Sequence, residues 1–274
     1  MIQIKPKKIE RIICMTEETT ETLYALGAQD LIIGISDYTV RPPQAPEEKP
    51  KISRFLDARI DKIIELKPDL VLAWSDLQAD IVKELIKEGI EVICFNHRSV
   101  NGILGMIERL GFIVNKHDEA LIYSRELQNE LNHIQDEASK FEKRPKVYFE
   151  EWFDPLISGI QWVSELIDLA GGDDVFKELS TSSLAKGRII ADQNEVIKRN
   201  PDIILASWCG KPVRFKKMLK REGWDQIPAI QNEQIFEIGS DIILQPGPAA
   251  LTDGVKEMHR IFKRYEIGKI KDES

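Results

Sequence analysis

The chain has 274 residues, of which 42% are hydrophobic and 31% are charged, and its formal net charge at pH 7 is −8. A nucleic-acid-binding surface would need a basic stripe, but the lysines are spread among acids. A membrane-spanning helix would need roughly 20 consecutive apolar residues, and the chain has no such run, so we expect one large or two small folded domains that neither bind nucleic acid nor cross a bilayer.

The N-terminal region lacks the pattern of a secretory signal. Its longest apolar run, 12–15, is followed by the acids Glu17 and Glu18, whereas a signal needs an apolar stretch of roughly 7–15 residues. The three cysteines lie far apart without CxxC spacing, which predicts neither a disulfide framework nor a zinc site. As written, the chain is therefore expected in the cytoplasm.

The first half of the chain alternates short apolar runs with amphipathic stretches, a pattern typical of parallel βαβ units. Gly27 follows the first amphipathic stretch, at the place where a glycine commonly ends a helix. In chain order, the expected elements are a strand at 12–15, a helix at 20–26, a strand at 31–35, a helix at 80–88 and a strand at 91–95.

One part of the sequence occurs twice. Residues 60–73 read IDKIIELKPDLVLA and residues 194–206 read NEVIKRNPDIILA, so that Asp61 aligns with Asn194. In each copy a helical stretch runs into Pro-Asp, where the proline ends the helix, and then into an apolar run typical of a strand buried on both faces. Two copies so far apart predict two similar lobes, and two lobes imply a cleft.

Residues 118–142 predict a single long helix, because the stretch contains no glycine or proline. At 1.5 Å per residue such a helix would span roughly 37 Å, enough to join two lobes. A short coiled coil is the alternative, but the stretch has too few heptads to favour it. The apolar residues that recur along one face are Leu127, Leu131, Ile134, Ala138 and Phe141.

The second half repeats the plan of the first. The expected elements are a strand at 147–150, a loop at 150–155, helices at 163–170 and 214–221, a strand at 234–238 and a helix at 251–265. The predicted fold is α/β, with two similar lobes of parallel sheets flanked by helices, one long backbone helix joining them, and a ligand cleft between the lobes. The predicted domains are an N-terminal lobe at 1–116, a linking helix at 117–144 and a C-terminal lobe at 145–274.

In open parallel sheets, ligands bind beyond the carboxyl ends of the strands. Tryptophans commonly fill cores, but three at strand ends favour walls for a large, flat, partly apolar ligand, since each buries roughly 150–250 Å². Residues predicted at these ends and in the adjoining loops are Glu17, Glu18, Tyr38, Phe55 and Trp74 in the first lobe, and Trp152, Arg188 and Trp208 in the second.

Several catalytic patterns are missing from the sequence. No GxGxxG, GxxxxGK[ST], GxSxG or HExxH motif occurs, and the four histidines are scattered. The sequence therefore predicts a binding protein, with no metal site and no cofactor of its own. The alternative, an enzyme on the same scaffold, would use Glu151, His97 or Cys209 as its chemical groups.

Three segments carry a family resemblance, namely IGISDYTVRPPQAP, ISRFLDARIDKIIELKPDLVLAW and ISGIQWVSELIDLAGGDDVF. From Arg11 to about Lys263 the chain resembles the substrate-binding proteins of ABC importers for cobalamin and ferric siderophores, the class III periplasmic binding proteins. It is most similar to the cobalamin-binding branch. The KPDLVLAW segment is general to the superfamily, whereas the SDYxxxPP loop and Phe55 are more specific to cobalamin.

The resemblance implies roles for individual residues. Proteins of this family dock on their permease through one acid at the start of each repeated helix. Those positions hold Asp61 and Asn194 here, and Glu195 is adjacent to the second. The residues implied to line the pocket are Tyr38, Phe55, Trp74 and the Glu17–Glu18 loop in the first lobe, and Arg188, Asp241 and Ile242 in the second.

The expected function is that of a monomeric solute-binding protein that clamps a corrinoid and delivers it to an ABC permease. The sequence as written departs from the family's pattern at the second docking acid and shows no export signal, for which a truncated or misassigned start codon is an alternative explanation. It also has Arg188 in place of an aromatic residue, which suits an anionic ligand. The open alternatives are a ferric-siderophore or haem-like chelate and a signal-less cytosolic carrier or sensor. The resemblance itself implies a periplasmic or cell-surface location.

Overall fold

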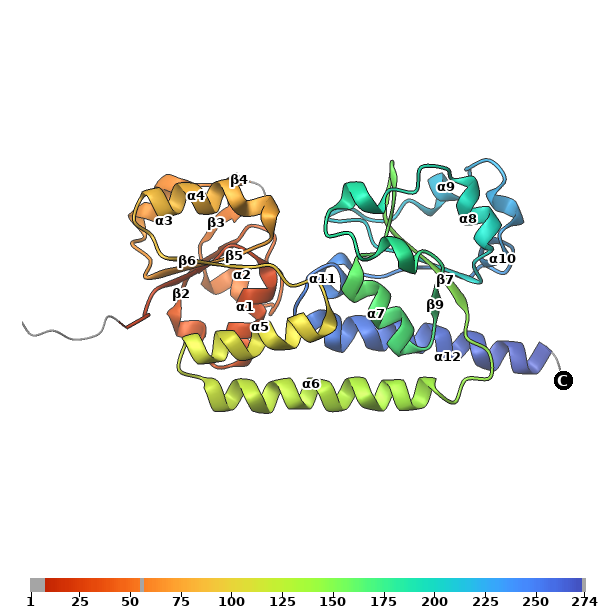
Figure 1. The fold of residues 1–274 in the computed structure, drawn as a ribbon, viewed down its shortest axis with the longest axis horizontal. Helices are drawn as coiled ribbons and strands as arrows, with labels where there is room; N and C mark the ends of the chain where they lie inside the picture. Colours follow the sequence, from red (N-terminus) through yellow and green to blue (C-terminus); the bar gives the residue numbers. More distant parts are fainter. Residues whose placement is uncertain (1–7, 55–56, 273–274) are drawn as a thin grey trace, which may run out of the picture. The chain divides into compact units, whose positions relative to one another are not determined.

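The computed structural model describes residues 8–54 and 57–272, and only the backbone of 269–272. These residues form two compact units, and each is described by itself. Unit 1 comprises the described residues of 8–97 and 101–126, and unit 2 comprises 98–100 and 127–272. Both units are α/β with mostly parallel sheets flanked by helices (Figure 1), which confirms the predicted fold class. Phe55 lies outside the described residues.

Unit 1 contains a six-stranded sheet in the order β4-β3-β2-β1-β5-β6. All neighbouring strands are parallel except β3 and β4, which form an antiparallel pair. The carboxyl ends of the parallel strands therefore meet at one edge. The strands are β1 (Ile12–Cys14), β2 (Ile32–Ser36), β3 (Lys51–Arg54), β4 (Asp57–Ala58), β5 (Leu70–Trp74) and β6 (Val92–Phe95).

Helices cover both faces of the unit 1 sheet (Figure 1). Ile63 of α3 and Leu85 of α4 pack on Val71 and its neighbours on one face, while α1 and α5 lie on the other. The helices are α1 (Glu17–Ala25), α2 (Ala45–Glu48), α3 (Ile60–Glu65), α4 (Ala79–Lys87) and α5 (Val100–Ile113), with short 3₁₀ turns at Gln29–Leu31 and Asp76–Gln78. Helix α6 (His117–Ala138) contributes residues to both units.

Unit 2 contains a five-stranded sheet in which β10 lies between β11 and β7. Both neighbours are parallel to β10, whereas β8 returns antiparallel along β7 to form a hairpin and β9 pairs with the start of β7. The strands are β7 (Lys146–Phe153), β8 (Leu156–Ser158), β9 (Asp173–Asp174), β10 (Ile203–Ala206) and β11 (Ile235–Glu237).

The core of unit 2 includes an aromatic-rich cluster on one face of this sheet. Tyr148, Trp208 and Trp224 are all buried in it, and α7 and α12 cover the other face (Figure 1). The helices are α7 (Gln161–Ala170), α8 (Asn194–Arg199), α9 (Phe215–Met218), α10 (Pro228–Gln231), α11 (Ser240–Ile243) and α12 (Val255–Asp272). Shorter turns are 3₁₀ at Lys177–Leu179, Ala185–Arg188 and Trp224–Gln226, and π-helical at Ala250–Gly254.

The two sequence repeats adopt the same local structure. Each helix, α3 or α8, is followed by a residue with positive φ (46° at Lys67, 52° at Asn200) that directs the chain into Pro-Asp. The aspartate then accepts a backbone N–H from the start of the neighbouring strand segment, Asp69 from Glu10 at 3.0 Å and Asp202 from Lys146 at 2.9 Å. The predicted repeat of helix, Pro-Asp turn and buried parallel strand is confirmed.

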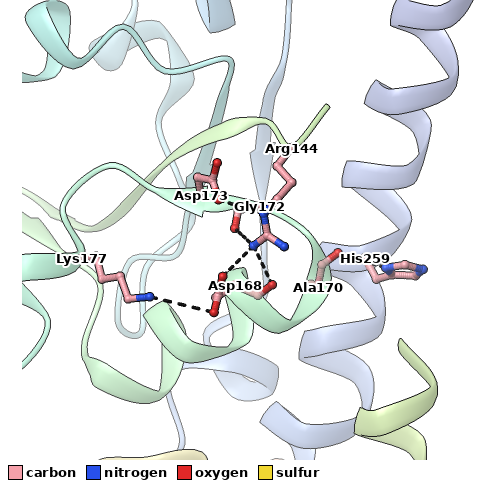
Figure 2. A network of polar contacts seen from close by, with 7 residues as sticks. All are labelled: Arg144, Asp168, Ala170, Gly172, Asp173, Lys177 and His259. Atoms are coloured by element: carbon pink, nitrogen blue, oxygen red, sulfur yellow. Dashed lines mark hydrogen bonds and ion pairs between the residues drawn. The ribbon is translucent and has the colours of Figure 1, made fainter. Parts of the chain in front are cut away.

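The carboxyl end of α7 is held by two side chains from outside the helix (Figure 2). Arg144 Nη2 donates to the carbonyls of Asp168 and Gly172 at 2.9 and 2.7 Å, and its Nε bonds Asp173. His259 of α12 places Nδ1 3.0 Å from the carbonyl oxygen of Ala170. These contacts add side-chain donors at the end of the helix, where the last carbonyls lack the intrahelical partners of regular turns.

Several element boundaries differ from prediction. The first helix begins at Glu17, three residues early, and the long helix ends at Ala138 instead of 142. Strand β7 continues through the expected loop to Phe153, because β8 pairs with it. No helix in the described part of the chain is both long and apolar enough to cross a bilayer.

Candidate ligand-binding site

The carboxyl-end edge of the unit 1 sheet brings Trp74 and His97 together. Trp74 ends β5, and its Nε1 donates to the His97 carbonyl at 3.3 Å, with the two rings edge-on at 6.3 Å. The backbone N–H of Trp74 donates to Gln78 Oε1 at 2.9 Å. The indole is therefore fixed at the edge and only slightly exposed, at 8%.

Glu17 and Glu18 lie in the first turn of α1 and are buried, so they form part of the base of this edge. Glu17 Oε1 accepts from Ser36 Oγ at 3.2 Å, and Glu18 Oε1 accepts from Thr16 Oγ1 at 2.5 Å. Burial raises the pKa of Glu18 to about 8, and burial also raises the pKa of Glu17. Tyr38, in the loop after β2, is 54% exposed and therefore available to a ligand.

In unit 2 a fully buried carboxylate lies below the corresponding edge. Glu150 accepts from Arg221 through both oxygens at 2.5 and 3.1 Å, from Trp208 Nε1 at 3.2 Å and from Tyr148 Oη at 3.2 Å. Burial raises the pKa of Glu150, and the hydrogen bond and charge of Arg221 oppose that rise. The charges of Glu150 and Arg221 are thus buried together as an ion pair.

A second ion pair involves the next residue of the same strand. Arg188 donates to both carboxylate oxygens of Glu151, with Nη2 at 2.8 Å from Oε1, and its Nη1 also reaches the carbonyl of Ser158. Arg188 is only 2% exposed. Its positive charge is therefore neutralised inside unit 2, and its ligand-binding role remains a prediction.

Three aromatic side chains pack together at this edge, and we call Trp152, Phe153 and Trp208 the aromatic wall. Ring centroids are 5.1 Å apart between Trp152 and Phe153 and 4.6 Å apart between Phe153 and Trp208. Lys211 Nζ lies 4.9 Å from the Trp152 ring centre, and Lys217 Nζ lies 5.4 Å from that of Phe153. Trp208 itself is only 2% exposed, so most of its ring belongs to the core.

A hollow of about 250 Å³ opens beside Trp208, at the carboxyl ends of β10 and β11. The structure brings Trp208 and Asp241, two residues predicted from sequence, to the same hollow, and Ile242 follows Asp241 in α11. Most of the residues that line the hollow were not predicted from the sequence, and they include glycines and polar side chains. The other lining residues are Gly210, Lys211, Pro212, Glu237, Ile238, Gly239 and Ser240.

The predicted docking acids occupy equivalent helix starts. Asp61 lies in the first turn of α3 and is exposed. Asn194 begins α8, and the neighbouring Glu195 accepts from Lys198 Nζ at 2.6 Å. Among the described residues, no group of three or more histidine, cysteine, aspartate or glutamate side chains is arranged to hold a metal ion.

Two α/β units with polar and aromatic strand edges are the architecture expected of the substrate-binding proteins of ABC importers. A family model described as "Periplasmic binding protein" matches residues 12–242, and the chain belongs to that family. The resemblance predicted from sequence is confirmed. The relatives in this class are described as binding proteins.

Individual relatives cover nearly the whole chain. The chain is 28% identical to the uncharacterized ABC transporter substrate-binding lipoprotein YvrC of Bacillus subtilis, over 94% of this chain and 80% of the relative. It is 27% identical to the vitamin B12-binding protein of Vibrio vulnificus, over 91% and 89% of the two chains. A possible iron-binding, periplasmic solute-binding protein from Staphylococcus epidermidis shares the fold, with a TM-score of 0.78, 24% identity and coverage of 93% and 99%.

Proposed function

We propose that the chain is a solute-binding protein, not an enzyme, that binds a corrinoid and delivers it to an ABC-type importer. A corrinoid is large and flat, and its peripheral side chains are mostly neutral amides. The relatives support the transport class, and the B12-binding relative supports the ligand. In this proposal Tyr38, Trp74 and the aromatic wall contact the ligand.

The observation that carries the ligand assignment is the neutralisation of Arg188 and Arg221. Each guanidinium is bound through two nitrogens by a glutamate, Glu151 or Glu150. If a ligand carboxylate bound either arginine, the partner glutamate would be left buried without its counter-ion. Breaking a buried ion pair in this way costs about 3–5 kcal/mol. A neutral, amide-rich ligand can bind without breaking either ion pair.

An anionic ferric chelate is the second candidate, and Lys211 favours it. Lys211 lines the hollow and lies over the Trp152 ring, held by a contact worth only about 0.5–1 kcal/mol at an exposed site. It is therefore free to turn toward a ligand carboxylate. The fold shared with a possible iron-binding protein is compatible with this candidate.

Titration with ligands tests the assignment. Cyanocobalamin at micromolar concentration should quench tryptophan fluorescence, and calorimetry should rank it above haemin and a ferric siderophore. Trp74→Ala should weaken cyanocobalamin binding by about 1–3 kcal/mol, by analogy with stacking of a base on an aromatic ring. Phe112→Ala is the matched control, because it removes an exposed ring of unit 1 far along α5 from the strand edge. Tighter binding of haemin or the siderophore would replace the corrinoid by the anionic candidate.

We further propose that Asp61 docks on the permease, with Glu195 as its counterpart in unit 2. Asp61 is exposed at the start of α3, as a docking acid must be. Asp61→Arg should leave cyanocobalamin affinity in solution unchanged and reduce uptake of labelled cyanocobalamin by cells that depend on this protein. Unchanged uptake would remove Asp61 from the docking surface, and Lys62→Glu serves as the neighbouring charge-reversal control.

A further inference from the structure

The aromatic wall of unit 2 rests on one buried ion pair. Trp208 is held by its indole N–H on Glu150, while the hairpin of β7 and β8 that carries Trp152 and Phe153 is held by Arg221, whose Nη2 donates to the Phe153 carbonyl at 3.1 Å. Glu150 and Arg221 are joined through two hydrogen bonds. The pair is therefore a polar link between the two halves of the wall, in addition to the direct contact of the Phe153 and Trp208 rings.

We propose that Glu150 and Arg221 are positioning residues that set the wall for the ligand without touching it, an inference that rests on the proposed binding function. Glu150 is completely buried, so it acts only through the groups bonded to it. Arg221 also lies over Trp224, with its guanidinium carbon 4.3 Å from the ring centre, so that it contacts the aromatic core as well as Glu150 and Phe153.

Stability alone gives no reason for this pair, because a well-packed apolar replacement of a buried ion pair is often neutral or stabilising. An apolar pair, however, makes no directional hydrogen bonds to its neighbours. The planar guanidinium fork fixes the angle between its two partners, here the carboxylate under Trp208 and the carbonyl behind Phe153. A lysine at position 221 would keep the charge and lose that angle.

Arg221→Lys tests the proposal while keeping the ion pair. The indole N–H resonances of Trp152 and Trp208, recorded on the free protein and assigned with Trp→Phe variants, should shift or broaden while that of Trp162 in α7 stays. Affinity for cyanocobalamin should fall about tenfold, because binding would then have to order a wall that one hydrogen bond from a charged donor holds in place in the parent protein. The double variant Glu150→Gln/Arg221→Met removes both charges and should show the same loss of affinity at near-native stability.

Arg144→Met is the matched control. Arg144 is also an ion-paired arginine of unit 2, but it holds the carboxyl end of α7 (Figure 2), so its loss should lower stability without moving the two indole resonances or the affinity. Unchanged resonances and affinity in both Arg221 variants, or equal changes in Arg144→Met, would overturn the proposal. If the parent protein binds no corrinoid, the proposed function fails, and the resonances of the free protein still decide the positioning role.

Discussion

Ser75 has a backbone conformation that serine rarely adopts. Its φ of 72° and ψ of 163° lie in a region used almost only by glycine. The surroundings hold it there, since its N–H donates to the Phe95 carbonyl at 2.7 Å and its Oγ accepts from the Leu77 N–H at 3.1 Å. Strain of this kind concentrates at binding sites, and Ser75 directly follows Trp74 at the strand edge.

The strain at Ser75 predicts an inverted order of stability for two variants. Both Ser75→Gly and Ser75→Ala lose the bond to Leu77, but only glycine relieves the strain. Ser75→Gly should therefore be more stable than Ser75→Ala by about 1–2 kcal/mol, although alanine normally exceeds glycine in this comparison. Urea unfolding of the two variants measures the difference, and an alanine variant at least as stable as the glycine one would contradict the strain.

Single residues of the site were predictable only in part. The positions of Trp74 and Trp208 at strand ends follow from the repeated Pro-Asp-strand pattern, which local sequence determines. The pairing of Glu150 with Arg221 joins residues 71 positions apart, and that of Glu151 with Arg188 joins residues 37 apart. Each of these adjacent glutamates pairs with a different arginine, and nothing in the local sequence reveals either partner.

At the scale of elements, helix α1 begins three residues before its predicted start, and the residues at that start give the reason. The stretch TEETT looks like a polar loop, but glutamates such as Glu17 and Glu18 are also common in the first turn of a helix. Thr20 and Thr22 bond back to the carbonyls of Thr16 and Glu18. These bonds keep the hydroxyls satisfied inside the helix.

No element was predicted for the residues of helix α5, which contains three glycines, and the reason for one of them is tertiary. A Cβ on Gly111 would lie 2.2 Å from the Ala120 Cβ of α6. The glycine therefore permits a close approach of two helices and is not a break. Along α6 the predicted apolar stripe is buried as far as Ala138, and Phe141 beyond the helix stacks on His259 at 5.6 Å.

At the scale of the whole molecule, both units keep carboxyl groups out of water. Burial raises the pKa of Glu17 and Glu18 in unit 1 and of Asp174 in unit 2. After burial, the side chains with the largest influence on the pKa of Glu18 are Thr16, Glu17 and Glu21, and the two glutamates raise it further. A chain with a net charge of −8 thus holds some of its acids in surroundings that favour the protonated form.

These acids predict a protein that is most stable in mildly acidic solution. For Glu18 the ordinary pKa is 4.5 and the folded pKa is about 8, so the folded state binds the extra proton between these values and stability is lost as the pH rises through that window. The free energy of unfolding should fall by roughly 1 kcal/mol per pH unit from this group alone. Urea unfolding at pH 5.5, 6.5 and 7.5 gives the slope.

Glu18→Gln isolates the contribution of this carboxyl from the general effect of the net charge. Glutamine keeps the shape and an acceptor for Thr16 Oγ1 but cannot ionise, so the slope should flatten by about the same 1 kcal/mol per pH unit. Glu257→Gln is the matched control, since the adjacent Arg260 lowers the pKa of Glu257 and its titration lies below this window. A Glu18→Gln slope equal to that of the parent protein would show that Glu18 is already ionised at pH 5.5 despite its burial.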